Sequence, residues 1–190
     1  VSYNFSGPIA ENTVAFSLGD FHAEILNFVT LRGNIGFSKV GDVITAVGSE
    51  LSAALVVSNA VYVRIEDAAF GMVMSEADGF GFEISEGSLA VQLGPLANIT
   101  AGEVFVQYTD ATRSFTAGDE IVAGSLSYTF GADAAASTIA FVVNDFAADV
   151  LGFVSLEGNL GFSKTGDDII AIGTELTTSL EISDSIYARL

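Results

Sequence analysis

The chain contains Asn34-Ile35-Gly36-Phe37-Ser38-Lys39-Val40-Gly41-Asp42 and repeats this stretch as Asn159-Leu160-Gly161-Phe162-Ser163-Lys164-Thr165-Gly166-Asp167. The offset is 164 − 39 = 125 residues, and it holds without a gap on both sides of the stretch. Repetition at a fixed period is the sequence signature of repeat architectures. We therefore divide the chain into a complete repeat, residues 1–125, and the first half of a second copy, residues 126–190. Such a chain is expected to be a piece of a longer array.

Apolar and polar residues alternate through the repeated stretch, a pattern typical of a half-buried strand. Val29, Leu31, Ile35 and Phe37 share one predicted face, and the second copy keeps this alternation. Residues 39–42 and 164–167 are predicted to be hairpin turns, in which glycine supplies a positive φ. Gly33 and Gly158 fall on the apolar face, where the missing side chain indicates a bend or a bulky neighbour packed over the strand.

Short runs of the same kind continue along the chain. We expect strands at residues 1–5, 43–47, 51–57, 61–65, 70–74, 80–84, 89–93 and 104–108, and a last strand from Ile121 to Phe130. No segment has a helical periodicity. The sequence thus predicts an all-β fold, either an antiparallel β-sandwich or an extended β-meander, built from the 125-residue tandem repeat. Five apolar positions, with their copies, are predicted to form its core: Leu31, Ile35, Phe37, Leu51 and Leu55.

The charge of the chain restricts its partners. Twenty-four acidic residues against six basic ones give a formal net charge of −18. Nucleic acid and anionic membrane surfaces attract basic side chains, so both are excluded as expected partners. No apolar run is long enough for a transmembrane helix, so membrane insertion is not expected. The acidity is explained either by solubility or by the binding of divalent cations.

Catalysis is not predicted. The only histidine is His22, and its counterpart in the second copy is Ala147, so a Ser–His–Asp arrangement would exist in one copy at most. The chain has no cysteine, which removes thiolate metal sites and cysteine nucleophiles. The absence of tryptophan also counts against a glycan-binding surface, because sugar sites usually offer aromatic platforms.

Acidic residues that recur in both copies are the candidate metal ligands. They are Asp20, Asp42 and Glu50, with their counterparts Asp145, Asp167 and Glu175. Calcium prefers carboxylate and carbonyl oxygens, so these six residues are predicted calcium ligands. The competing interpretation is that an aspartate beside a turn glycine is ordinary turn chemistry. The spacing does not match an EF-hand loop.

The second copy of the repeat, residues 153–173, resembles the tandem β-repeats of very large secreted or surface-attached bacterial proteins, many of them adhesin-like. That resemblance implies an extender role at the cell surface or outside the cell, with neighbouring repeats of the same protein as partners, and in many adhesins with calcium as a stiffener. Two alternatives stay open. One is a subunit of a self-assembling extracellular β-rich filament, and the other is a glycan- or ligand-binding β-domain.

Overall fold

The computed structural model describes residues 11–26, 29–183 and 186–189. They form fourteen β-strands and no helix, and so contain no helix that could span a membrane. The predicted all-β class is confirmed; the strand predicted at residues 1–5 lies outside the described residues. The strands are β1 (Thr13–Ile25), β2 (Val29–Val40), β3 (Val43–Ser58), β4 (Val61–Ser75), β5 (Gly79–Ser85), β6 (Ser88–Leu93), β7 (Ala97–Ala101), β8 (Glu103–Thr109), β9 (Glu120–Ala123), β10 (Leu126–Thr129), β11 (Thr138–Val150), β12 (Val154–Thr165), β13 (Asp168–Ser183) and β14 (Ile186–Arg189).

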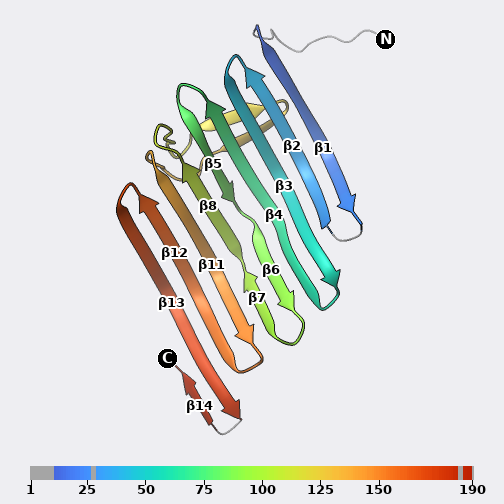
Figure 1. Cartoon of the computed structure of the whole chain (residues 1–190), viewed down its shortest axis with the longest axis vertical. Coiled ribbons are helices and arrows are strands. Elements are labelled where there is room, and N and C mark those ends of the chain that lie inside the picture. Colours follow the sequence, from blue (N-terminus) through green and yellow to red (C-terminus); the bar gives the residue numbers. More distant parts are fainter. Residues whose placement is uncertain (1–10, 27–28, 184–185, 190) are drawn as a thin grey trace.

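Twelve of these strands form one antiparallel sheet (Figure 1). Ten of them follow the order β1-β2-β3-β4-β5-β8-β11-β12-β13-β14, and β6 and β7 lie off this path. We call each position in this order a column. Two columns in the middle of the sheet are each made of two short strands. β5 and β6 pair successive parts of β4, and β8 and β7 pair successive parts of β11. Of the two predicted architectures, the described residues therefore form the extended meander.

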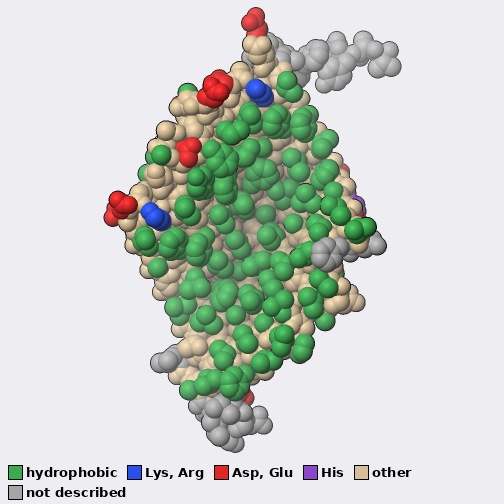
Figure 2. Space-filling model, in the orientation of Figure 1, with side chains coloured by type: hydrophobic (Ala, Val, Ile, Leu, Met, Phe, Trp, Pro, Cys, Tyr) green, Lys and Arg blue, Asp and Glu red, His purple; other side chains and the backbone are tan. Residues whose placement is uncertain are grey.

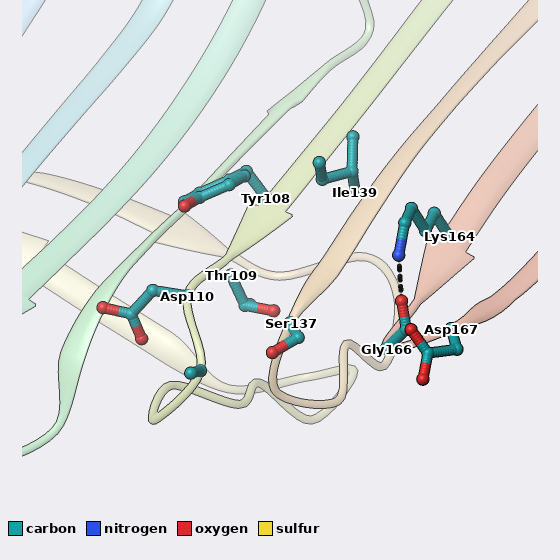
Figure 3. Close-up of a pocket in the computed structure, with 9 residues that line it drawn as sticks. Tyr108, Thr109, Asp110, Ser137, Ile139, Lys164, Gly166 and Asp167 are labelled. Carbon is teal, nitrogen blue, oxygen red and sulfur yellow. Dashed lines mark hydrogen bonds between the residues drawn. The ribbon is translucent and has the colours of Figure 1, made fainter.

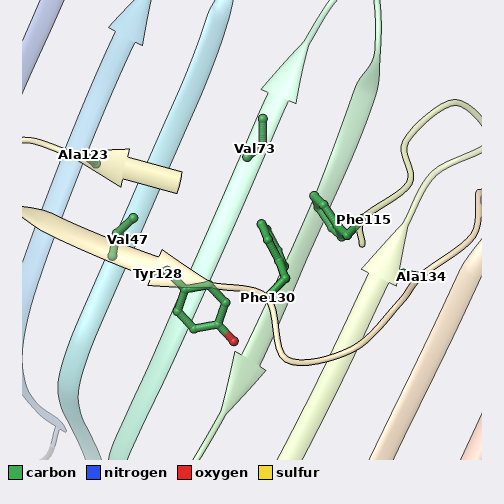
Figure 4. Packing of buried hydrophobic residues seen from close by; sticks show 7 residues of the cluster. All are labelled: Val47, Val73, Phe115, Ala123, Tyr128, Phe130 and Ala134. Carbon is green, nitrogen blue, oxygen red and sulfur yellow. The ribbon is translucent and has the colours of Figure 1, made fainter. Parts of the chain in front are cut away.

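A second layer is confined to one hairpin. The predicted strand from Ile121 to Phe130 is wrong, because β9 and β10 pair with each other and lie across the sheet instead of extending it. This hairpin belongs to the long crossover between β8 and β11. Ala123 and Tyr128 of the hairpin belong to the main cluster of buried apolar residues, together with Val47 and Val73 of the sheet and Phe130 of the crossover (Figure 4).

The predicted core residues lie on the other face of the sheet. Val47 is fully buried under the hairpin and pairs with Gly36, so the neighbouring Ile35 and Phe37 point away from the hairpin. Leu31, Ile35, Phe37 and Leu51 are only half-buried, and Leu55 is 40% exposed. The prediction of a core at these positions is wrong, since alternation shows which residues share a face and not whether anything covers that face.

Strand pairing repeats along the sheet with the offset seen in the sequence. Phe16 pairs with Phe37 in β1–β2, and Phe141 pairs with Phe162 in β11–β12. The register shifts after Leu18 in the first pair and after Val143, 143 − 18 = 125 residues later, in the second. The predicted bulky neighbours over Gly33 and Gly158 are confirmed as the side chains of Leu51 and Leu176. The proposed boundary between residues 125 and 126 falls in the turn of the β9–β10 hairpin.

Candidate functional site

Four of the six predicted ligands lie at irregularities in the strands. Asp20 and Glu50 have φ angles of 51° and 52°, and Asp145 and Glu175 have φ angles of 50° and 56°. Left-handed residues of this kind occur at β-bulges, where an extra residue on one strand is unpaired. Bulges explain why β1 and β11 each shift register at the same relative position.

An asparagine ties each pair of acidic residues together. Asn34 accepts a hydrogen bond from the backbone N–H of Asp20 at 3.0 Å and donates one to Oε2 of Glu50 at 2.9 Å. In the second copy, Asn159 accepts from the N–H of Asp145 at 2.9 Å and donates to Glu175 at 3.0 Å. We call these groups the first bulge site (Asp20, Asn34, Glu50) and the second bulge site (Asp145, Asn159, Glu175).

The two bulge sites differ in the side chains around them. The first lines an open depression of about 370 Å³ together with His22 and Arg32. The second lines one of about 270 Å³, where Ala147 and Glu157 replace those two residues. A ligand recognised by the imidazole or the guanidinium would therefore bind at the first site alone. The two sites share the asparagine bridge, which binds the backbone N–H of one bulge and the carboxylate of the other.

The other two predicted ligands, Asp42 and Asp167, lie in the turns that follow β2 and β12, away from the bulges. Calcium takes six to eight oxygen ligands, and at each bulge site one carboxylate oxygen already accepts an amide hydrogen bond. In the described part of the chain, no three or more His, Cys, Asp or Glu side chains gather as a metal site requires. Calcium binding stays a prediction.

A third depression of about 420 Å³ lies where β8 ends beside the β12–β13 turn (Figure 3). Asp110 and Lys164 stand on opposite sides of it, and the Lys164 ammonium donates to the carbonyl oxygen of Gly166. Asp110 accepts hydrogen bonds from the backbone N–H groups of Phe80, Thr112 and Arg113. These donors lower the pKa of Asp110 to about 2. A carboxylate so fully engaged organises the loop and is a poor proton acceptor.

One buried carboxylate is absent from the predicted site residues. Glu83 is 0% exposed, and its carboxylate accepts hydrogen bonds from Gln107, from the Tyr128 hydroxyl and from the N–H of Gly131. Burial raises the pKa of Tyr128 above its usual value, and the charge of Glu83 raises this pKa further. The sequence could have pointed to Glu83, because it is a charged residue within the otherwise apolar strand predicted at residues 80–84. Its partners show that it fastens the crossover to the sheet.

Comparison of the chain with protein-family models, curated proteins and solved structures finds no match. The functional argument therefore depends on the geometry of the described residues.

Proposed function

We propose that the chain is a structural segment, an extender of a larger extracellular or cell-surface bacterial assembly, built from the 125-residue repeat. The observation that carries this proposal is the common register of β1–β2 and β11–β12 within one continuous sheet. Copies related in this way can follow one another by adding strands in the same order. Stability in such arrays comes from each repeat and from its interface with the next.

The surface of the sheet on which the hairpin packs supports the same proposal. Gly36 lies so close to the β9–β10 hairpin that a Cβ there would stand 2.2 Å from the carbonyl oxygen of Ala123. Its counterpart Gly161 would have as nearest neighbour a methyl group of Val142 at 3.9 Å. Val47 is fully buried under the hairpin, whereas its counterpart Ile172 is 60% exposed. The second copy thus leaves the equivalent surface uncovered, and this surface suits the hairpin of another copy.

The use of the polar groups also favours a structural role over catalysis. Asp110, Glu83 and the two asparagines of the bulge sites all hold loops or backbone in place. The extracellular location is inferred from the resemblance described above and is consistent with a net charge of −18.

The proposal is tested with an extended chain, residues 1–190 followed directly by residues 66–190, which continues the 125-residue period. We expect its thermal midpoint to exceed that of the 190-residue chain, because each added interface contributes stability. An unchanged midpoint, with two separate transitions, would mean that the copies fold as independent units and would contradict the proposal.

Calcium is proposed as a stiffener of the array and has its own test. The thermal midpoint of the chain is measured in excess chelator and in excess calcium, and a ligand that binds only the folded state raises it. We expect a rise that is lost when the two bulge sites are neutralised together in the variant D20N/E50Q/D145N/E175Q. The control variant D42N/D167N separates the turn carboxylates from the bulge carboxylates. No rise in the unmodified chain would assign the charge to solubility.

A self-assembling filament is the second candidate, favoured by the edges of the sheet. β1 ends the strand order on one side, and on the other side β14 pairs β13 only from Ser179 onward. Among the described residues, the outer edges of β1 and of the first part of β13 therefore have no partner strand. Exposed edges accept strands from other chains. Filaments that appear with rising concentration in negative-stain images would support this candidate. Their absence at the highest soluble concentration would contradict it.

A further inference from the structure

The sheet face opposite the hairpin is apolar from one end of the strands to the other. Strand registers place the same kind of residue in every column of this face (Figure 2). We call it the apolar face, and its members above the bulges include Val14, Phe16, Leu18, Ile35, Phe37, Ile44, Ala46, Phe70, Met72, Met74, Phe80, Phe82, Ile84, Val106, Tyr108, Ile139, Phe141, Leu160, Phe162, Ile169 and Ala171. Below the bulges it continues through Leu31, Ala53, Ile65 and Leu89.

Large side chains of the apolar face are in contact with water. Phe16 is 50% exposed, Phe141 is 42% exposed and Ile169 is 63% exposed. Soluble monomers rarely expose a continuous apolar patch larger than a few hundred Å². The long strands have 12 to 16 residues, and the sheet has nine columns from β1 to β13. At about 3.3 Å per residue and about 4.8 Å per column, the face measures roughly 40 Å by 40 Å, or roughly 1,600 Å².

Charge is distributed around the apolar face and not within it. On this face the registers place Lys39 and Lys164 at one rim. The turns of that rim also carry acidic residues, among them Asp42, Asp78 and Asp167. The β3–β4, β6–β7 and β11–β12 turns lie at the opposite rim, and their described residues carry no charge. The carboxylate of Asp149, at the end of β11, accepts a hydrogen bond from the N–H of Gly152 in the last of these turns. Figure 2 shows charged side chains gathered mainly at the upper rim of the view.

We propose that the apolar face packs against the apolar face of a second copy of this chain, so that the two large sheets form a sandwich with the hairpins on its outer sides. A specific interface of standard size buries about 800 Å² on each partner, and obligate, more apolar interfaces bury more. The roughly 1,600 Å² of this face falls in the obligate range. A second copy supplies a surface of the same size, flatness and polarity, as an isologous interface requires.

The alternation of large and small side chains on the apolar face suits such packing. The large side chains include two stacked aromatic pairs, Phe16–Phe37 and Phe141–Phe162, each with ring centroids 5.5 Å apart. The small residues Ala46 and Ala171 lie in the adjacent columns, opposite Phe37 and Phe162. Two packed sheets interdigitate their inner side chains across about 10 Å, and alternating large and small residues allow this.

The turns at the two rims favour one relative direction of the two copies. The β2–β3, β4–β5 and β12–β13 turns carry Asp42, Asp78 and Asp167, and they would repel the same turns of a partner laid over them. Placing these turns over the β3–β4 and β6–β7 turns of the partner avoids this repulsion. The strand axes of the two sheets then cross at the roughly 30° that twisted sheets adopt when they pack.

The test uses two single variants, each of which places one carboxylate at an exposed apolar residue. F141E alters the apolar face, at a residue that is 42% exposed. V122E alters the outward side of the β9–β10 hairpin, at a residue that is 56% exposed. Both side chains touch water in the single chain, so we expect both variants to fold, with β-sheet circular dichroism like that of the unmodified chain.

Sedimentation equilibrium then reports the assembly state across a range of concentrations. We expect the unmodified chain and V122E to form dimers, and F141E to dissociate at least a hundredfold more readily. Equal association of the two variants would overturn the proposal. So would an unmodified chain that is monomeric, whether it stays in solution or floats with added phosphatidylcholine vesicles. Flotation would assign the face to a lipid surface instead. The pairing does not depend on the extender role, because it concerns the face and not the edges of the sheet.

Discussion

Replacing Gly36 by alanine should destabilise the protein, whereas the same replacement at Gly161 should not. The two glycines occupy equivalent places in β2 and β12, between Ile35 and Phe37 and between Leu160 and Phe162. Neither glycine has a φ that requires glycine. The difference between them is the hairpin that covers Gly36.

The magnitude follows from the distances. A Cβ on Gly36 would stand 2.2 Å from the Ala123 carbonyl oxygen, and this oxygen belongs to backbone that no rotamer change can move. The hairpin must lift by about 1 Å or more, and such overpacking typically costs about 1–3 kcal/mol. Alanine gains about 0.5–1 kcal/mol over glycine within a strand at both positions. That gain cancels between the variants, so their unfolding free energies should differ by about 1–3 kcal/mol.

Urea unfolding of Gly36→Ala and Gly161→Ala at one protein concentration measures this difference. With a urea m-value of about 1–3 kcal/mol/M, the midpoints should lie about 1 M apart. Amide hydrogen exchange gives a second readout, because a lifted hairpin should exchange faster in β9 and β10 of the Gly36→Ala variant alone. Equal midpoints and unchanged exchange in the hairpin would refute the close packing of the hairpin on β2.

Three further outcomes are expected. The pKa of Asp110 is about 2 in the folded chain against an ordinary value of 3.8, so its stabilising effect is present above pH 3.8 and is lost as the pH falls towards 2. Acid unfolding of Asp110→Asn should therefore be less pH-dependent than that of the unmodified chain in this interval. Asn34→Ala and Asn159→Ala should each cost about 1 kcal/mol in urea unfolding, since each removes one bridge between bulges; unequal costs would show that the two sites are not equivalent. Phe130→Ala should cost about 3–5 kcal/mol by the same measurement, because Phe130 is 1% exposed and stacks on Phe115; a cost below 1 kcal/mol would contradict its place in the core.

Period-two alternation was sufficient to predict β2 and its counterpart β12, and to show which of their residues share a face. It placed Phe37 and Ser38 on opposite faces, and it placed the solvent-exposed Arg32 and Glu157 on the polar side. It also marked Gly33 and Gly158 as positions under a bulky neighbour, which proved to be Leu51 and Leu176. These features depend on local geometry, which the sequence pattern reports directly.

The bulges within the strands were harder to predict from the sequence. The sequence predicted separate strands at residues 43–47 and 51–57, but the structure has one strand, β3, that continues through the bulge at Glu50. A bulge keeps the strand paired while one residue adopts a positive φ, and the prediction took the polar residues there for a connection. Asn34 could have been recognised, because it recurs in both copies beside the acidic residues that it bridges.

The layer arrangement was not predictable from local pattern. The hairpin buries Val47 and Gly36 on the more polar face and leaves the apolar face, with Leu31 and Phe37, uncovered in the single chain. Which face is covered depends on where the crossover from β8 to β11 runs, a contact between residues far apart in the sequence. The buried Glu83 has the same origin, since its partners Tyr128 and Gly131 lie on that crossover.

Small-angle scattering of the extended chain, residues 1–190 followed by 66–190, tests most directly whether copies continue one sheet. From β1 to β8 a repeat contributes six columns before the equivalent strand β11 begins. Six columns at about 4.8 Å predict that the particle lengthens by about 29 Å along one axis, with the same thickness and width as the 190-residue chain. A particle that instead thickens, or that lengthens as two jointed bodies, would contradict the account of a continuous repeated sheet.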